Sequence, residues 1–532
     1  MKKNFLLASL SGLLLGLSWP TYGFSLLLFI GFVPLLFVEQ NLRAHAGKRA
    51  GLKLIGYSYI TFLLFNAITT WWLWNSTVFG MFFAFWLNAS LMTLVFFIYH
   101  KVARKANAKT ALFFLVVFWI SFEKFILNWD FSWPWLNLGN GFSYNHKWIQ
   151  WYAYTGVFGG TLWIWLVNIG VYLSLKNYFE LRDLKKLSKG LLCNFSIIIL
   201  GIYGSLYIYY NYNSKANDVA EVVLIQPNID SYTEKYNISN LESAKNLIAM
   251  TNGVIDSTTN FVIAPETTFA NPVLQENYTN TEAYKLIKDF TKTNPHINFI
   301  GGYTFYKQYQ SIEQPSESAN RFKNSKNKWY DMYNSAAFIK AHNEPKIYYK
   351  SKLVAGVELF PYKNILQPIL GESLINLGGS ISSLGTQSNR DVFSSDNFNV
   401  APIICYESIY GNFVNGFVQN GANFLAVITN DGWWKNTQGH KQHLMLSKLR
   451  AIENRRSLVR AANTGVSAVI NQKGDIVKRL DYGIKGVIKA KIRLNNNLTF
   501  YTKYGDYIAR ISQFLSMLIL LTVFLRKRTT IF

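Results

Sequence analysis

Three residues of this chain carry groups that together could perform nucleophilic chemistry, namely Glu266, Lys350 and Cys405. A thiol attacks as its thiolate, and an unperturbed thiol with a pKa of about 8.5 is mostly protonated at neutral pH. The carboxylate of Glu266 could accept the thiol proton and later return it to a leaving group. The ammonium of Lys350 could stabilise the thiolate and the oxyanion of a tetrahedral intermediate. The three residue types therefore predict covalent catalysis at Cys405.

Each of these residues also has an ordinary structural explanation when it is taken alone. Cysteine is among the most buried residue types, so Cys405 could be a core thiol. Glu266 could lie in a solvated turn, and Lys350 could belong to a charged surface. The other cysteine, Cys193, lies in an apolar run, so the two cysteines indicate neither a disulfide framework nor a metal cluster.

Short β-branched runs alternate with helical stretches from Asp218 onward. The runs end in polar residues or glycine: AEVVLIQPNI, FVIAPET, INFIGGYTF, NSAAFIK, KIYYKSKLV, NVAPIICYES, NFLAVITND and TGVSAVINQKG. Helical spacing appears in LESAKNLIAMTNGVI and QHLMLSKLRAIENRRSLVRAA. The alternation predicts an α/β layered domain over residues 213–507. Functional groups of such domains gather at the C-terminal ends of strands, where Glu266, Lys350 and Cys405 are all expected.

Long apolar blocks fill the first 210 positions and return after position 508. The chain is 50% hydrophobic and 17% aromatic, with a formal net charge of +24. A spanning helix needs roughly 20 apolar residues, and we predict membrane spans at about 5–19, 22–38, 54–74, 78–99, 111–127, 156–174, 191–210 and 508–525. Basic residues also flank such spans, so we expect a membrane and no nucleic acid as the partner.

The loops between these spans alternate in charge. Every second loop is basic, whereas the loops around Asn75 and at 128–154 are poor in lysine and arginine. By the positive-inside rule, both termini then lie in the cytoplasm. We therefore predict a membrane domain with seven helices (1–212), an extracytoplasmic domain (213–507), and a C-terminal helix with a short cytoplasmic tail (508–532). The basic loop residues are Arg43, Lys48, Arg49, Lys53, Lys101, Arg104, Lys105, Lys109, Lys176, Arg182, Lys185, Lys186, Lys189, Arg526, Lys527 and Arg528.

Aromatic residues in two segments have two explanations each. The loop 128–154, which contains Trp133, is either an interfacial belt or a lipid-side wall of a site on the outer face. Trp433 and Trp434 are either interfacial anchors or side chains that limit water at the site.

The segment that follows these tryptophans carries histidines and many basic residues. His440 and His443 have the spacing of a helical turn but no third ligand, so we expect no metal, and no cofactor motif appears in the chain. The basic side chains form either a solvated helix face or contacts to lipid phosphates. They are Lys448, Arg450, Arg455, Arg456 and Arg460.

The three motifs occur in an order that resembles a known superfamily. Glu266 in a Pro-Glu strand end, Lys350 in Tyr-x-Lys and Cys405 in Cys-Tyr-Glu follow the order of the nitrilase (carbon–nitrogen hydrolase) superfamily. With the membrane half included, residues 1–530 resemble the bacterial apolipoprotein N-acyltransferase family. TNDGWWKNTQGHKQHLMLSKLRAIENRRSLVRAANTGVSAVI resembles that family's stretch after the nucleophile, and QPNIDSYTEKY resembles its first domain strand and loop. The resemblance implies a polytopic α-helical membrane region of about eight spans plus a nitrilase-like αββα sandwich.

The resemblance also implies a role for each site residue. In chain order, the triad would be the general base and acid, the oxyanion stabiliser and the nucleophile. Glu358 and Glu407 would position the lysine or the polar network, and Tyr406 would shape the pocket. Further substrate-binding candidates are Tyr236, Trp133, Trp433 and Trp434.

The implied activity is the last step of lipoprotein maturation. An acyl chain would pass from a phospholipid, with phosphatidylethanolamine as the expected donor, through a cysteine thioester to the α-amine of diacylglyceryl-cysteine on an apolipoprotein. The protein would be a monomer in the bacterial inner membrane, with its catalytic domain on the periplasmic face and no cofactor. Two other classes stay open: a membrane-tethered nitrilase-type amidase, and a non-catalytic lipid or lipoprotein carrier.

One loop departs from the family pattern. The family reads His-Leu-Val-Pro-Phe-Gly-Glu where this chain has Lys352-Leu-Val-Ala-Gly-Val-Glu358. Glu358 keeps the family's spacing from Lys350, so the departure concerns the conformation of the loop 352–358. The glycine- and serine-rich segment 371–391 is expected to form a flap.

Overall fold

The computed structural model describes residues 2–45, 47–213, 218–310, 314–322, 327–362 and 383–525. The chain divides into two compact units. The first, here called the helical unit, comprises residues 1–73, 79–211 and 504–532, and the second, the α/β unit, comprises residues 74–78 and 212–503. The turn Trp74–Val78, which joins two helices of the first unit, therefore packs with the α/β unit.

Long apolar helices make up the helical unit. They are α1 (Lys2–Leu17), α2 (Val33–His45), α3 (Ala50–Thr70), α4 (Val78–Ala103), α5 (Ala108–Ile126), α7 (Val157–Leu181), α8 (Leu184–Asn211) and α15 (Tyr507–Leu525). By length and composition, six segments of the described chain could cross a membrane: Ser25–His45, Gly47–Asn75, Val78–Ala103, Val157–Leu181, Leu184–Asn211 and Tyr507–Leu525. α1 has only 16 residues, and α5 carries Lys109, Glu123 and Lys124. The count of eight spans stays a prediction.

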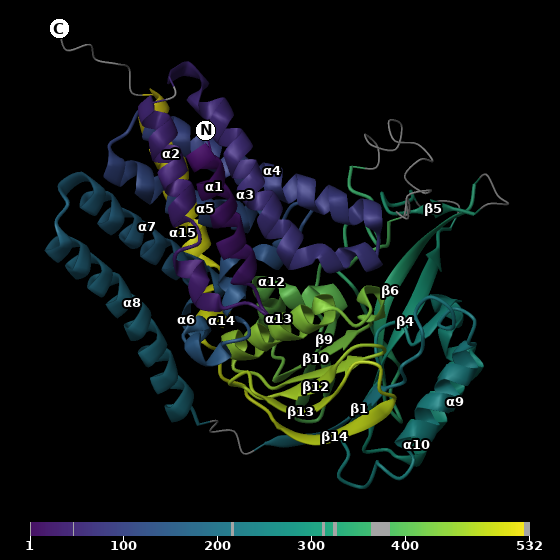
Figure 1. Ribbon diagram of the computed structural model, residues 1–532. Coiled ribbons are helices and arrows are strands. Elements are labelled where there is room, and N and C mark those ends of the chain that lie inside the picture. Colours follow the sequence, from purple (N-terminus) through teal and green to yellow (C-terminus); the bar gives the residue numbers. More distant parts are fainter. Residues whose placement is uncertain are drawn as a thin grey trace. The chain divides into compact units, whose positions relative to one another are not determined.

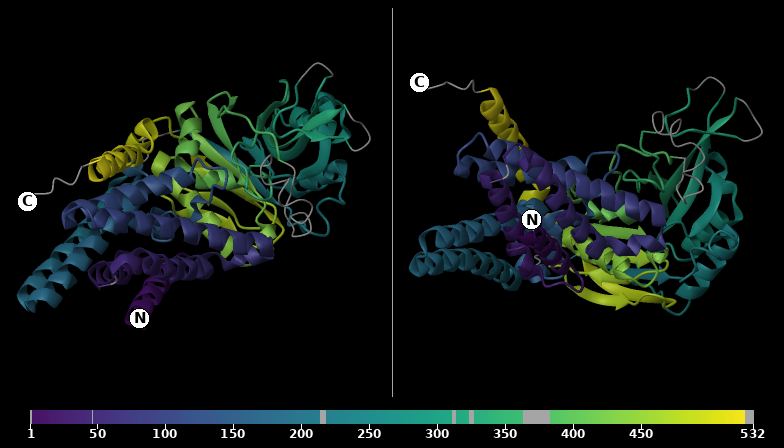
Figure 2. Two further views of the ribbon diagram at one scale, coloured as in Figure 1. Left: turned by 90° about the horizontal axis from the view of Figure 1, so that it is seen from above. Right: turned by 45° about the horizontal axis from the view of Figure 1, so that its top comes forward.

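Aromatic rings fill the centre of the helical unit. Phe32 stacks on Trp165 with ring centroids 4.3 Å apart, and Trp119 meets Phe32 edge-on at 5.1 Å. The long helices α7 and α8 lie side by side (Figure 2). Trp133, from the aromatic loop, stacks on Trp135 with centroids 5.4 Å apart. The rings of this loop thus pack against one another in the helical unit.

Two β-sheets form the centre of the α/β unit (Figure 1). The first has the order β14-β1-β2-β4-β6-β5, with β3 on β4 and β7 on β6. Its strands are β1 (Val219–Gln226), β2 (Phe261–Ile263), β3 (Phe269–Leu274), β4 (Asn298–Gln308), β5 (Asn320–Arg321), β6 (Trp329–Ile339), β7 (Lys346–Tyr349) and β14 (Gly486–Arg493). The second has the order β13-β12-β11-β10-β9-β8. Its strands are β8 (Phe393–Ser395), β9 (Phe398–Ile404), β10 (Phe424–Thr429), β11 (Leu458–Ala462), β12 (Ser467–Ile470) and β13 (Ile476–Leu480).

Helices cover the outer face of each sheet (Figure 1). α9 (Asn240–Thr251) and α10 (Glu282–Thr293) bury Leu247 and Ile287 against the first sheet. α12 (Gly411–Gln419) and α13 (Gln438–Asn454) lie on the second. The inner faces meet where Phe261 of β2 touches Phe424 of β10, with ring centroids 5.2 Å apart. The predicted nitrilase-like αββα sandwich beside a helical membrane region is confirmed.

The central strands are parallel, and this decides where the site forms. β2 runs parallel to β1 and β4, and β10 runs parallel to β9 and β11. Parallel strands are covered on both faces, which explains the nearly continuous apolar runs VAEVVLIQ and FLAVIT. Their carboxyl ends therefore come together at one edge of each sheet, and polar side chains just beyond them can converge.

Candidate active site

The three predicted triad residues follow three strand ends of the α/β unit. Glu266 comes after β2, Lys350 directly after β7, and Cys405 directly after β9. All three side chains are buried. The Lys350 Nζ lies 3.1 Å from Glu266 Oε1. The structure thus brings the carboxylate and the ammonium into direct contact.

Lys350 is shared between two carboxylates. Its Nζ also donates to Glu358 Oε1 at 2.8 Å. Asn334 on β6 joins the same pair, because its Nδ2 donates to Glu266 Oε1 at 2.7 Å and to Glu358 Oε1 at 3.1 Å. Asn334 also holds the lysine backbone, since the Lys350 N–H donates to the Asn334 carbonyl at 2.8 Å. Sequence reasoning missed Asn334: the only signal is one polar residue at the start of the run NSAAFIK.

The backbone around Glu266 is closely packed. Its second carboxylate oxygen, Oε2, accepts from the Asn430 N–H at 3.0 Å. The Gly302 N–H on β4 donates to the Pro265 carbonyl at 3.1 Å. A Cβ added at Gly302 would lie 2.3 Å from the Thr267 nitrogen and 2.6 Å from the Glu266 Cα. Only glycine lets β4 approach this loop so closely.

Cys405 sits at a sharp turn between β9 and a short 3-10 helix, Cys405–Ile409. Its φ of 49° lies in the left-handed region, which is uncommon for a residue with a side chain. Such conformations persist only where the surroundings enforce them, and they cluster at active sites. The turn places Cys405 directly at the carboxyl end of β9.

Glu407 ties this turn to the lysine loop. Its Oε2 accepts from the Ile404 N–H at 2.8 Å, just before the cysteine. Its Oε1 accepts from the Ser351 N–H at 2.6 Å and from the Tyr348 hydroxyl at 2.7 Å, on either side of Lys350. One buried carboxylate therefore sets the positions of both Cys405 and Lys350. Burial raises the pKa of Glu407 to about 7, against the opposing effect of these hydrogen bonds.

The charges of the triad support one another. Burial alone would raise the pKa of Glu266, but the cations Lys350 and Lys235 outweigh it and hold that pKa below its ordinary value. Burial would lower the pKa of Lys350, and Glu266 and Glu358 instead raise it well above the ordinary value. For Cys405, burial and then the Glu266 charge raise the pKa, partly offset by Lys350. The resting site thus holds a neutral thiol, an ionised Glu266 and a protonated Lys350.

A second buried hydrogen-bond network contacts the backbone of Cys405. His443 Nε2 lies 3.1 Å from Ser408 Oγ and 3.3 Å from the Cys405 carbonyl oxygen. His443 Nδ1 lies 3.0 Å from Asp431 Oδ1, and Arg460 donates to Asp431 Oδ2 at 2.5 Å. The ligand atoms of Cys405, Asp431 and His443 lie within 4.8 Å of one another, a spacing that would suit a metal ion. The Arg460 guanidinium is already bound to this carboxylate, however, and its charge opposes a metal cation there.

The basic residues after Trp434 do not form a surface. Lys448 and Arg450 on α13 are buried, as are Arg455 and Arg456 just after it and Arg460 on β11. Arg450, for example, pairs with Glu453 at 2.8 Å and donates to the Ile409 carbonyl at 2.7 Å. The prediction of a solvated or lipid-facing basic helix is wrong, because these guanidinium groups bind backbone carbonyls and carboxylates inside the domain.

The predicted substrate-binding residues differ in their exposure and in the unit to which they belong. Tyr236 is 59% exposed, and Trp433 and Trp434 are half-buried. The Trp433 ring meets Tyr232 edge-on at 5.3 Å. Tyr406 is buried, with its ring 5.4 Å from that of Tyr410. Trp133 belongs to the helical unit described above.

The loop 352–358, which departs from the family pattern, still brings Glu358 into contact with Lys350. The Glu358 N–H donates to the Val354 carbonyl, and Glu358 Oε2 accepts from the Val354 N–H, both at 2.9 Å. Gly356 takes a φ of 81° at the tip of this turn. Of the predicted flap 371–391, residues 371–382 lie outside the described chain. In the remainder, Gln387 accepts from the Tyr349 N–H at 2.7 Å, next to Lys350.

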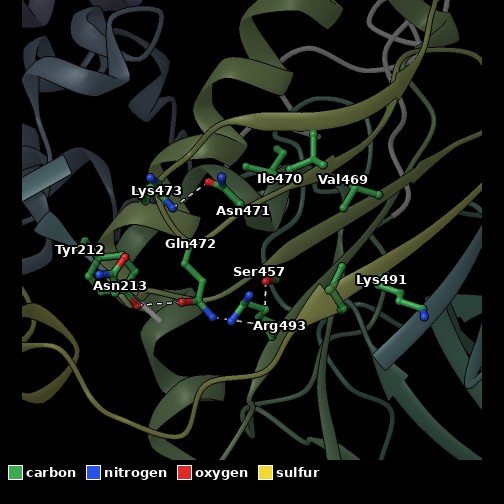
Figure 3. A pocket seen from close by; sticks show the side chains of 12 residues that line it. Tyr212, Asn213, Ser457, Val469, Ile470, Asn471, Gln472, Lys473, Lys491 and Arg493 are labelled. Atoms are coloured by element: carbon green, nitrogen blue, oxygen red, sulfur yellow. Dashed lines mark hydrogen bonds between the residues drawn. The ribbon is translucent and has the colours of Figure 1, made fainter. Parts of the chain in front are cut away.

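One cavity of the α/β unit lies elsewhere (Figure 3). It has a volume of about 550 Å³ and is lined by residues of β12, β13 and β14 and by Tyr212. Two of the lining residues are joined by a hydrogen bond, in which Tyr212 donates to Gln472 Oε1 at 2.8 Å (Figure 3). None of its lining residues belongs to the triad.

Comparison with known proteins identifies the family. Residues 222–497 match the carbon–nitrogen hydrolase model, and residues 11–170 match the model of the apolipoprotein N-acyltransferase N-terminal domain. The chain belongs to the carbon–nitrogen hydrolase family. Within that family, the two matched regions together have the layout of the apolipoprotein N-acyltransferases, as the sequence predicted.

Relatives of similar length bear the same name. Apolipoprotein N-acyltransferase of Chlorobaculum tepidum is 28% identical over 542 residues, covering 99% of this chain and 98% of that protein. Apolipoprotein N-acyltransferase 1 of Treponema denticola is 24% identical over 567 residues, covering 98% and 97%. Saccharomyces cerevisiae Nit3, of branch 10 of the nitrilase superfamily, aligns with a TM-score of 0.37 and 12% identity over 57% of this chain and 96% of that one. The family assignment and the class of enzyme, a bacterial membrane N-acyltransferase, are confirmed.

Proposed function

We propose that this protein forms a thioester between Cys405 and a phospholipid acyl chain, and passes that chain to the α-amine of diacylglyceryl-cysteine on an apolipoprotein. The observation that carries the proposal is the contact of 3.1 Å between Lys350 and Glu266, both buried beside a cysteine in a left-handed turn. A base, a cation and a nucleophile are the three parts that acyl transfer through cysteine requires.

In the first half-reaction, the Cys405 thiol gives its proton to Glu266 as sulfur attacks the ester carbonyl carbon. The Lys350 ammonium and the Tyr406 backbone N–H stabilise the resulting oxyanion. The tetrahedral intermediate collapses, the ester C–O bond breaks, and Glu266 gives the proton to the departing alkoxide. The products are a thioester on Cys405 and a lysophospholipid.

In the second half-reaction, the α-amine of the acceptor attacks the thioester carbonyl. Glu266 takes one proton from the amine, the C–S bond breaks, and the thiolate takes that proton back. The products are an amide and the free thiol. Because the first product leaves before the acceptor binds, the steady-state kinetics follow a ping-pong pattern.

Exposed apolar side chains suit a substrate that comes from a bilayer. Tyr232, Tyr236 and Val357 are each about half exposed in loops next to the triad. We place this surface toward the outer face of the cytoplasmic membrane, with both chain termini in the cytoplasm. The donor is phosphatidylethanolamine, and the protein acts as a monomer. Limiting water at the thioester favours transfer to the amine over hydrolysis.

Intact-mass spectrometry of the purified protein tests the proposal. Wild type incubated with phosphatidylethanolamine should gain one fatty-acyl mass, which a diacylated lipopeptide with a free α-amine then removes. Cys405→Ala should gain none, whereas Cys193→Ala, which changes the exposed second thiol, should behave as wild type.

Absence of the adduct from wild type, with the lipopeptide left unmodified, would refute the thioester route. Hydrolysis of small amides that depends on Cys405 would then support the amidase alternative. Stoichiometric binding of lipid without turnover would support a carrier.

A further inference from the structure

A second lysine lies in the active site, and the triad does not account for it. Lys235 is only 7% exposed, although it belongs to a loop rather than to a strand or helix. Its Nζ donates to the Thr267 hydroxyl, on the residue after Glu266. Among the ion pairs of the described residues, none includes Lys235, whereas Lys350 has two.

The loop that carries Lys235 is held firmly. Asp230 Oδ1 accepts from the N–H groups of Tyr232 and Thr233, both at 2.8 Å, and the Lys235 N–H donates to the Asp230 carbonyl at 3.0 Å. Ser231 donates to Asn430 Oδ1 at 3.1 Å. The backbone N–H of Asn430 is itself a donor to Glu266. The loop is therefore built onto the segments that hold the general base.

The aromatic neighbour of this loop completes its support. The Tyr232 hydroxyl donates to the Trp433 carbonyl at 2.9 Å, and the Lys235 Nζ lies 6.0 Å from the centroid of the Trp433 ring. A cation gains modestly from such a ring face. The position of the ammonium is thus set by three segments, none of which offers it a carboxylate at ion-pair distance.

A buried cation without an adjacent carboxylate is costly unless charges slightly farther away compensate. The titratable groups that face Lys235 are Glu266, Cys405 and Lys350. Burial lowers the pKa of Lys235 to about 8, and the negative charges of Glu266 and of the Cys405 thiolate oppose that fall. At neutral pH the group is mostly an ammonium, and a thiolate would stabilise it.

From this placement we infer that Lys235 is a positioning residue of the acyl-transfer site, a second cation that supports the negative charge shared by Glu266 and Cys405. This inference rests on the proposed role of Cys405 as the nucleophile. Lys350 stabilises the charge from one side of Glu266, and Lys235 does so from the loop beside Thr267. When the thiol proton moves to Glu266, the negative charge moves to sulfur, and both cations remain close enough to stabilise it.

The pH dependence of thiol alkylation tests this inference. The full-length protein in detergent, in a Cys193→Ser background, is treated with iodoacetamide from pH 6 to 10, and adduct formation is followed by intact mass. Removing a nearby positive charge raises the pKa of a thiol. Below the thiol pKa the alkylation rate follows the thiolate fraction, so Lys235→Met should slow alkylation by roughly tenfold between pH 6 and 8, where Lys235 is mostly an ammonium in wild type.

Two variants separate charge from structure. Lys235→Arg keeps the charge and should be alkylated at close to the wild-type rate. Lys245→Met changes an exposed lysine on α9 and should not change the rate. If Lys235→Met does not fold, Thr267→Val, which removes the hydroxyl that holds the ammonium, should slow alkylation as well. An unchanged alkylation rate between pH 6 and 8 in a folded Lys235→Met protein would overturn the inference.

The acyl-enzyme assay keeps this result separate from the proposed function. Wild type that takes no acyl group from phosphatidylethanolamine refutes the function, while the alkylation profile still decides whether Lys235 acts on Cys405. Wild type that acylates while Lys235→Met shows a wild-type alkylation profile refutes Lys235 alone. A merely structural lysine would reduce the amount of folded protein without changing the alkylation rate constant of the folded fraction.

Discussion

Substitution of Gly302 by alanine should separate the position of Glu266 from the stability of the fold. Gly302 lies on β4, where the strand passes the loop after β2. The added Cβ would meet backbone atoms, with 2.3 Å to the Thr267 nitrogen and 2.6 Å to both the Glu266 Cα and the Pro265 oxygen. Real Cβ contacts stay above 3.0 Å, so the strand and the loop must separate by roughly 0.7 Å. Backbone atoms cannot rotate away as a flexible side chain can.

This separation should act mainly on catalysis. A reacting group misplaced by about 1 Å can cost on the order of 100-fold in rate, which corresponds to about 2.7 kcal/mol of transition-state stabilisation. We therefore expect Gly302→Ala to slow acyl-enzyme formation by about 100-fold in a single-turnover assay with phosphatidylethanolamine. Mass spectrometry of Cys405 supplies the rate directly.

Gly301 provides a matched control on the neighbouring residue. A Cβ there would meet the ring of Phe299 at 2.8 Å and the ring of Phe269 at 3.3 Å, both in the apolar core. Gly301→Ala should lower the midpoint of thermal unfolding, by less than Gly302→Ala because a ring can shift where backbone cannot, and should slow acylation by less than about fivefold. Equal acylation rates in the two folded variants would show that the close approach at Gly302 does not set the position of the base.

Two further predictions follow from buried polar groups. Asn334→Asp removes two hydrogen bonds to carboxylates, each worth about 1.5–3 kcal/mol, and adds a third negative charge beside Glu266 and Glu358. The rate of acylation should therefore fall by more than about 100-fold. The control Asn343→Asp, in an exposed loop, should leave that rate unchanged. Lys235 releases its proton more readily when folded, with a pKa lowered from 10.5 to about 8. The unfolded chain therefore binds more protons across that window, and stability rises with pH through it by at most roughly 3 kcal/mol. Lys235→Met should lack this rise and melt at a higher temperature than wild type at pH 7. Melting curves that stay parallel from pH 7 to 10 would contradict the assignment of the buried charge.

The strand ends that carry the triad could be predicted because local patterns determine them. A β-branched run that stops at Pro265-Glu266 or at Cys405 indicates where a strand ends and a loop begins. Parallel strands then align these ends without any further information. The long apolar helices could be predicted for a similar reason, since span length is a local quantity.

Burial of polar residues could not be predicted in the same way. The run of basic residues from Lys448 to Arg460 was expected on a surface helix, yet Arg450 on α13 and Arg460 on β11 bind partners supplied by distant segments. Lys235 is a clearer example, because the sequence predicted a site role for its neighbour Tyr236 and none for the lysine. Its burial depends on contacts such as that of Ser231 with Asn430, which are 199 residues apart. No local periodicity reports such a contact.

The same long-range contacts explain why the site needs more cations than its triad supplies. Within the site, Glu266, Glu358 and Asp431 carry negative charge, and a thiolate at Cys405 would add another. Arg460 neutralises Asp431 by direct contact, and Lys350 is shared between the two glutamates. When the thiol ionises while Glu266 is still charged, these four negative charges exceed the two cations by two. Lys235 is a buried cation that offsets part of this excess, so a chain that kept the triad but lost this lysine should retain the fold and yet hold its thiol protonated to higher pH.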